Sequence, residues 1–146
     1  MMTVRKSSIF LASVEEIYDK LVKLETLQHI AYPYATFEPV NGENELIWEK
    51  DTVSSFRFKL FGFIPFGVHT IKVAQFDLVE GIYTYESNKH VLVWNHEITL
   101  ERINDNTTKY ADVVEIDAGW KTVFVYLWAK CFYGHRQRKW KRLLKK

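Results

Sequence analysis

The sequence is poor in cysteine, proline and glycine. Its 146 residues include one cysteine, three prolines and six glycines. The single cysteine, Cys131, excludes an intramolecular disulfide and a metal site built from several thiolates. Such cysteine usage is typical of a reducing compartment, so we expect a cytoplasmic protein. The few prolines and glycines punctuate turns and form no linker or repeat, which predicts one domain over residues 1–146.

Long hydrophobic runs and familiar catalytic motifs are also missing. The longest apolar run, residues 123–129, is far shorter than the roughly 20 residues that cross a bilayer. Residues 1–10 show no signal-peptide pattern, so we expect no targeting or transmembrane segment. The sequence contains no G-x-S-x-G nucleophile elbow, P-loop or G-x-G-x-x-G fingerprint. It therefore gives no support to enzymes that depend on those motifs.

Aromatic residues are abundant instead. Ten phenylalanines, eight tyrosines and five tryptophans make up 16% of the chain, within a globular composition of 47% hydrophobic and 26% charged residues. So many large rings in a small protein must line either a dense core or a pocket.

Charge is distributed unevenly along the chain. The last twelve residues carry seven lysines and arginines and no acid, whereas the remainder carries 13 basic against 18 acidic residues. Such a tail can meet nucleic acid or an anionic surface. The alternative is a solvated helix end whose cations complement the helix dipole.

The order of periodic segments predicts an α+β fold. We expect a strand at residues 3–11 and a helix pair from Ser13 to about residue 31, opened by a Ser13–Glu16 capping box, broken near Lys23 and stopped by Pro33. Recurring turn signals, the first at Asn41, then separate segments rich in β-branched and aromatic residues. These predict an antiparallel meander of strands at residues 46–50, 53–61, 68–78, 82–86, 91–102 and 108–117.

Residues 120–144 predict one long C-terminal helix of about 40 Å. Trp120, Phe124, Leu127 and Cys131 recur at helix-compatible spacing. The first half is apolar almost all round, so we expect it to be covered on more than one side, which makes a homodimer plausible. We expect the basic second half to emerge into water, and Cys131 to be a packed small hydrophobe and not a nucleophile. One helix does not fill the concave face of a sheet of about seven strands, which predicts an internal cavity.

This order resembles the START-like superfamily, also called SRPBCC or helix-grip, to which the birch pollen allergen, lipid-transfer domains and polyketide cyclases belong. The opening SSIFLASVEEIYDKLVKLETLQHI is similar to that family's first strand and helix pair. The closing GWKTVFVYLWAKCFYGHRQRKW is similar to its gripping helix. The resemblance implies a helix-grip fold over nearly the whole chain. It leaves function open, because the superfamily hosts carriers, sensors, enzymes and ribosome-associated factors.

Strand alternation brings polar side chains onto the predicted cavity face. In residues 92–100 the even positions are mostly apolar, so His96 points inward beside Trp94. The next strand places Tyr110 and Asp112 on one face, with Asp112 near Ile98 and diagonal to His96. Counting back across the preceding hairpin puts Glu86 near Trp94, and His69 lies one strand further away. The expected cluster is therefore His69, Glu86, His96 and Asp112.

Three interpretations of this cluster remain open. His96 and Asp112 satisfy each other in the core, or they orient a polar group of a bound ligand, or Glu86, His96 or Asp112 acts as a catalytic acid or base. No spacing supports a metal site, and we expect neither metal nor cofactor.

A phenylalanine-rich segment, residues 56–67, surrounds a glycine- and proline-containing turn. Core packing is one interpretation. The other is a mobile apolar rim at the cavity mouth that includes Phe61 and Phe63, which would also suit contact with a membrane surface or a second protomer.

We therefore expect a binding or carrier protein for a small apolar molecule or lipid, in preference to an enzyme. The expected ligand-binding residues are His69, Glu86, Trp94, His96, Tyr110, Asp112, Phe124, Leu127, Trp128, Cys131, Phe61 and Phe63. The alternatives are a cyclase- or dehydratase-type enzyme using the buried acids and histidine, and a macromolecule-binding module using the basic tail.

Overall fold

The computed structural model of this protein describes residues 1–40 and 48–145. Within them, seven antiparallel strands form one sheet in the order β1-β7-β6-β5-β4-β3-β2, accompanied by three α-helices and a short 3-10 helix. In chain order the elements are β1 (Met2–Phe10), α1 (Val14–Leu21), α2 (Leu24–Ala31), β2 (Ala35–Pro39), β3 (Val53–Leu60), β4 (Ile64–Asp77), β5 (Gly81–Ser87), β6 (Val93–Asn104), β7 (Thr107–Asp117), η1 (Gly119–Lys121) and α3 (Thr122–Leu143).

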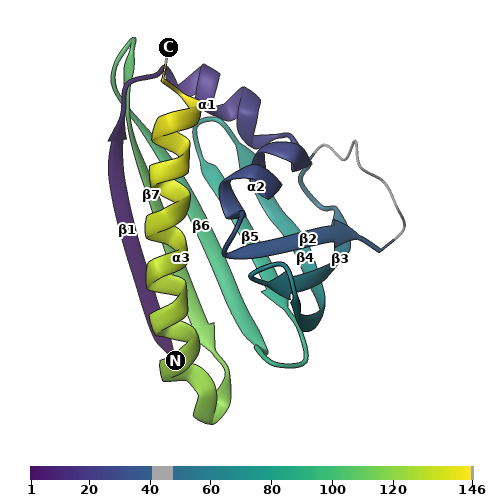
Figure 1. Cartoon of the computed structure of the whole chain (residues 1–146). Helices are drawn as coiled ribbons and strands as arrows, with labels where there is room; N and C mark the ends of the chain where they lie inside the picture. The colour runs from purple at the N-terminus through teal and green to yellow at the C-terminus, as the bar shows by residue number, and fades with distance from the viewer. Residues whose placement is uncertain (41–47, 146) are drawn as a thin grey trace.

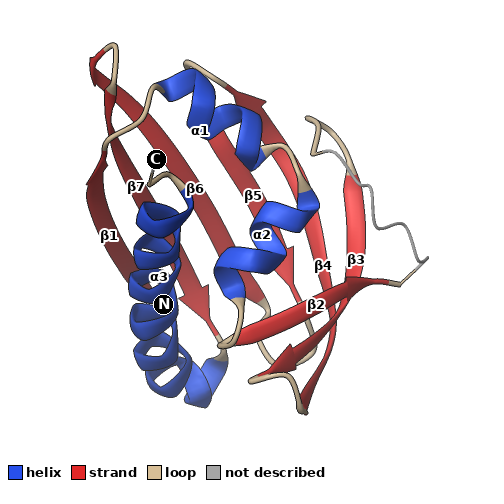
Figure 2. Ribbon diagram, turned by 45° about the horizontal axis from the view of Figure 1, so that its top comes forward, coloured by secondary structure: helices blue, strands red, loops and turns tan. Residues whose placement is uncertain are grey.

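The sheet curves around its helices. All three α-helices lie on one face of the sheet (Figures 1 and 2), with α3 along the β1–β7 side and with α1 and α2 in front of the central strands. Register shifts in the β3–β4 and β4–β5 pairs mark irregularities of the kind that bend a sheet. The predicted α+β helix-grip architecture is confirmed. None of the described helices is both long enough and apolar enough to cross a membrane.

The helix pair forms for the reason that the sequence indicates. The hydroxyl of Ser13 accepts a 3.1 Å hydrogen bond from the amide of Glu16, which caps α1. Ile17 and Leu21 then bury one face of that helix. The helical structure is interrupted at Val22 and Lys23, and α2 begins at the next residue. The carbonyl of Val22 accepts a hydrogen bond from the amide of Trp48.

One predicted strand is wrong. Of residues 46–50, residues 46 and 47 lie outside the described part of the chain, as does the predicted turn at Asn41. Residues 48–50 form no strand. Trp48 is instead buried in the core, with its ring 5.7 Å from that of Phe56, and its amide bonds to the helix pair and not to the sheet. The second strand of the sheet is β2, immediately after the helix pair.

The C-terminal half of α3 is anchored on the sheet. The side-chain amide of Gln137 donates to the carbonyl of Lys6 at 2.9 Å and accepts from the hydroxyl of Ser8 at 2.5 Å. Trp140 is fully buried, with its ring 6.1 Å from Phe10 and 5.9 Å from Tyr110. The expectation that this basic half emerges into water is therefore wrong for one of its faces, because the helix is amphipathic there.

The N-terminal half of α3 is more exposed than expected. Trp120 before the helix, and Val123, Phe124 and Leu127 within it, are each more than half exposed. Among the described residues the helix packs mainly against β1, β7 and α2, so it is not covered on all sides. A homodimer that covers these side chains stays a prediction.

Two glycines provide a matched test of backbone packing. Gly81 has φ +98°, and a Cβ built there would lie 2.9 Å from the carbonyl oxygen of Ile98. Gly119 has φ +62° but no atom within 4 Å of such a Cβ. We expect Gly119→Ala to lower the free energy of unfolding by about 1 kcal/mol through backbone strain, and Gly81→Ala by at least about 2 kcal/mol because a clash is added. Urea unfolding of both variants checks this, and equal losses would contradict the steric argument.

Candidate functional site

A cavity of about 630 Å³ lies between the sheet and α3. Its walls are mostly apolar, with Phe56, Ile71 and Val73 from the sheet and Trp128 and Phe132 from α3. The cavity exists because α3 rests on β1 and β7, at one side of the sheet, which leaves the concave face of the other strands incompletely covered. Its volume is in the range of pockets that hold small molecules.

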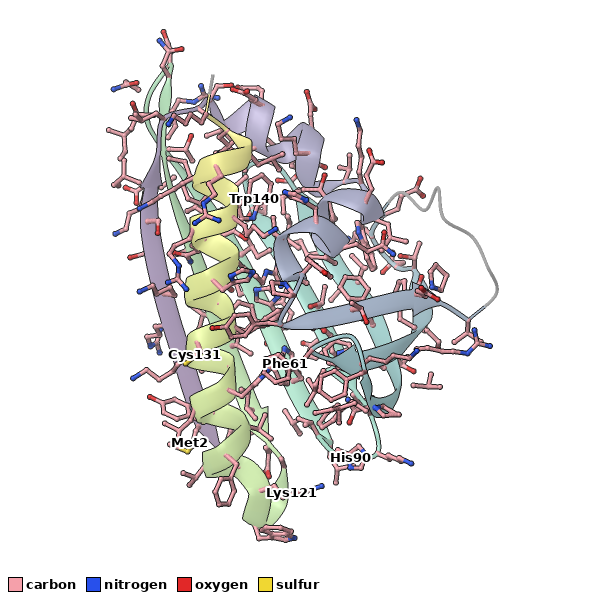
Figure 3. All side chains as sticks on the ribbon, in the orientation of Figure 1. Met2, Phe61, His90, Lys121, Cys131 and Trp140 are labelled. Carbon is pink, nitrogen blue, oxygen red and sulfur yellow. The ribbon has the colours of Figure 1, made fainter. Side chains whose placement is uncertain are left out.

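The cavity opens near the N-terminal end of α3. Trp120 and Phe124 line it, although 82% and 67% of their surfaces are exposed. Lys121 and His90 also line it, and the Lys121 Nζ lies 3.5 Å from the His90 Nδ1. Figure 3 places these two residues at the same end of the molecule. Exposed residues that also line the cavity define its mouth.

A chain of polar side chains crosses the inner wall. The His69 Nε2 lies 2.8 Å from one oxygen of Glu86, and the hydroxyl of Thr84 donates to the other at 2.6 Å. That second oxygen lies 4.0 Å from the Nδ1 of His96, whose Nε2 lies 2.7 Å from Asp112 Oδ1. Four strands, β4 to β7, supply these groups, so the expected cluster is present.

Asn88 determines which nitrogen of His69 carries the proton. The Asn88 Oδ1 accepts from the amides of His90 and Val91, both at 2.8 Å. Its amide nitrogen must therefore face the His69 Nδ1, 3.0 Å away, and donate to it. His69 then carries its proton on Nε2 and donates to Glu86. Glu86 is held as an acceptor at the cavity wall.

Asp112 is completely buried behind this wall. Its carboxylate accepts from His96, from the Gln137 amide at 3.0 Å and from the Tyr110 hydroxyl at 3.4 Å. Burial opposes the charge, but the hydrogen bond and electrostatic attraction of His96, the positive charge of Arg136 and the bond from Gln137 lower the pKa of Asp112 below its usual range. Likewise, burial opposes the charge of Glu86, but the hydrogen bond from His69 and the neighbouring imidazoles lower its pKa.

Tyr133 and Arg136 complete the inner end. The indole nitrogen of Trp94 donates to the Tyr133 hydroxyl at 3.1 Å, and the ring of Tyr133 lies 5.0 Å from that of His96. Burial raises the pKa of Tyr133, so its hydroxyl stays protonated. The guanidinium carbon of Arg136 lies 5.1 Å from the centre of the Tyr133 ring.

Residues 8–144 match the family described as "Domain of unknown function (DUF8410)". The chain belongs to the DUF8410 family. A search of the curated proteins gave no match.

Solved structures share the architecture of this DUF8410 chain. A START superfamily protein from Mycobacterium smegmatis superposes with a TM-score of 0.68 at 13% identity, over 97% of this chain and 96% of that one. Protein CV1439 from Chromobacterium violaceum gives 0.72 at 15%, over 98% and 97%. Ara h 8.0201 gives 0.69 at 14%, over 98% and 97%. These likenesses show a START-like fold, as the sequence resemblance implied.

The structure places six of the expected site residues of this DUF8410 protein in the cavity wall: His69, Glu86, Trp94, His96, Phe124 and Trp128. Tyr110 and Asp112 are buried behind the wall and do not line it. The strand registers from which the polar cluster was predicted are confirmed: Ile98 lies opposite Asp112, and Glu86 lies opposite Trp94.

Four expected residues lie outside the cavity wall. Leu127 and Cys131 are exposed on α3, so the expectation that Cys131 is packed is wrong. The row that faces the cavity is 124, 128, 132 and 136, four residues apart, and positions 127 and 131 fall beside it. Phe61 and Phe63 lie in the exposed β3–β4 turn, while Phe58 and Phe66 beside it line the cavity.

Sequence reasoning missed Tyr133, Arg136 and Asn88. The four-residue spacing that links Phe124 to Arg136 was a usable signal, but the basic composition around Arg136 favoured a solvated helix face. Asn88 follows β5 in a predicted turn, where an asparagine side chain is ordinarily expected to bond to the nearby backbone. Ligand contact by the expected site residues, and acid–base chemistry by Glu86, His96 or Asp112, stay predictions.

The lowered pKa values of Asp112 and Glu86 predict acid sensitivity. Their stabilising contribution is fully present above about pH 4.5 and is lost as the pH falls toward their folded-state pKa values, because the unfolded chain then binds more protons. We expect Asp112→Asn to lower the free energy of unfolding at pH 7 by about 2–3 kcal/mol and to flatten the loss below pH 4.5.

Asp19→Asn is the matched control, because Asp19 is exposed on α1. We expect it to change stability by less than about 0.5 kcal/mol and to keep the wild-type acid profile. Urea unfolding from pH 7 to pH 2.5 measures both variants. An unchanged acid profile in Asp112→Asn would contradict the assigned role.

Proposed function

We propose that this protein binds and carries a small, largely apolar molecule in the cavity between the sheet and α3. The observation that supports this most directly is the cavity itself, of about 630 Å³, with walls of aromatic and aliphatic side chains and a mouth beside Trp120 and Phe124. Removing an apolar molecule from water against such walls stabilises the complex by about 25 cal/mol per Å² of buried apolar surface.

The polar chain gives the ligand an orientation. Glu86 and His96 are held at the inner wall by partners of their own, namely His69 and Thr84 for the acid and Asp112 for the imidazole. Fixed polar groups in an apolar cavity select the orientation of a ligand that carries one polar end. In this proposal the polar end lies at the inner end of the cavity, where Glu86, His96, Tyr133 and Arg136 gather, and the apolar body extends toward the mouth.

The carrier proposal predicts one binding site per chain, whose affinity is lowered by a substitution that fills the cavity but not by one on the outer surface of α3. Val125 lines the cavity, whereas Leu127, two residues further along α3, is 55% exposed. We expect the neutral fluorescent probe N-phenyl-1-naphthylamine to bind once per chain. Val125→Trp should weaken its binding at least about tenfold by filling the cavity, and Leu127→Trp should change it less than about twofold.

Titration of probe fluorescence measures these affinities, with the melting temperature of each variant as a check of folding. Equal affinity in Val125→Trp and the wild type would place the probe elsewhere and contradict the proposal. Native followed by denaturing mass spectrometry of the purified protein identifies any molecule that is already bound.

One observation favours a second candidate function, acid–base catalysis of a cyclase or dehydratase type. His96 lines the cavity while Asp112 holds its Nε2 from behind, an arrangement that orients an imidazole for proton transfer. His96→Ala separates the two functions once a ligand is known. It should abolish turnover in an enzyme but weaken binding only in a carrier, as product analysis and ligand titration would show.

A further inference from the structure

Arg136 lies inside the protein although its neighbours in the sequence form a basic tail. It occupies the cavity-facing row of α3, four residues after Phe132 and eight after Trp128, and is only 5% exposed. By contrast Arg138, two residues further on, is exposed. The chain thus encloses one guanidinium of this segment in the cavity wall.

The guanidinium has unused hydrogen-bond donors. Its Nε and Nη2 are buried and find no hydrogen-bond partner among the described residues. The faces of the Tyr133 and Phe132 rings lie beside it in the wall, with their centres 5.1 and 5.6 Å from the guanidinium carbon. Ring faces favour the charge but accept no strong hydrogen bond. Enclosing such donors without a partner is costly, which indicates a site built for an acceptor.

The nearby carboxylates favour the charged form of Arg136 but accept no hydrogen bond from its Nε or Nη2. Burial opposes the charge, but Tyr110, Asp112, Tyr133 and Glu86 raise the pKa of Arg136. The oxygens of Asp112 are already taken by His96, Tyr110 and Gln137, and those of Glu86 by His69 and Thr84. Within the described chain, neither carboxylate forms an ion pair with the guanidinium.

Tyr133 adds a donor beside this charge. Its oxygen accepts from the Trp94 indole, and among the described residues its own proton has no acceptor. Arg136 and Tyr133 both line the cavity, with the guanidinium carbon 5.1 Å from the centre of the Tyr133 ring, so both bring unused donors to an otherwise largely apolar wall.

We propose that Arg136, assisted by the Tyr133 hydroxyl, binds the carboxylate of an apolar monocarboxylic acid held in the cavity. This rests on the proposed carrier function and names its ligand class. A carboxylate matches the planar guanidinium fork and supplies the missing counter-charge. A phosphate monoester fits less well, because its second negative charge would lie near Glu86 and Asp112.

The test compares ligands that differ only at the head. The first pair is 1-pyrenebutanoate and 1-pyrenebutanol, followed by fluorescence. The second is dodecanoate and 1-dodecanol, measured by displacement of N-phenyl-1-naphthylamine, with dodecyl phosphate as a third head group. We expect the wild type to bind each acid at least about tenfold more tightly than its alcohol, and dodecyl phosphate more weakly than dodecanoate.

Two variants locate the preference. Arg136→Met should reduce the acid-to-alcohol affinity ratio to about one while alcohol affinity changes less than about threefold, and Arg138→Met should leave the ratio unchanged. Circular dichroism and melting temperature report folding. If Arg136→Met does not fold, Arg136→Lys decides, since it keeps the charge but lacks the fork, and should lower the ratio at least about threefold.

The outcomes separate the two proposals. Equal binding of acid and alcohol by the wild type, a preserved ratio in the folded Arg136 variant, or tighter binding of dodecyl phosphate would each overturn the carboxylate assignment and leave the carrier proposal standing. Absence of binding by every acid and every alcohol would overturn the carrier proposal, and the ligand class with it.

Discussion

The buried carboxylate of Asp112 is the interaction on which the rest of the structure depends. It accepts hydrogen bonds from β6 through His96, from its own strand through Tyr110 and from α3 through Gln137. Gln137 in turn binds β1 through Lys6 and Ser8. A charge enclosed in this way is tolerated only with its partners in place, so it fixes the rotation of α3 and the orientation of His96 together.

The position of α3 then determines where space remains. With its C-terminal half held against β1 and β7 by Gln137 and Trp140, the helix cannot also cover the central strands of the curved sheet (Figure 2). The uncovered part of the concave face becomes the cavity, and the N-terminal half of α3 forms its near wall and mouth. The same packing leaves Val123 and Leu127 exposed, because no described element of this chain covers them.

The inner end of the cavity combines groups that neutralise one another at a distance. Glu86 and Asp112 each accept hydrogen bonds from other side chains. Their negative charges stabilise the charged form of Arg136, but their oxygens accept no hydrogen bond from its Nε or Nη2. The apolar walls strengthen each of these interactions, because they lower the local dielectric constant. Under the proposed carrier function, this polarity is what would distinguish the two ends of a ligand.

The sequence by itself determined the faces of the strands. Alternation has a period of two and short hairpins fix the register, so the meeting of His69, Glu86, His96 and Asp112 was predictable. It did not determine which side of α3 faces inward. The first half of that helix is apolar all round, and the basic second half reads as solvated, so periodicity favoured Leu127 and Cys131 and left Arg136 outside. Only packing against β1 and β7 decided the row from Phe124 to Arg136, because the contacts that fix a helix's rotation come from residues far away in the chain.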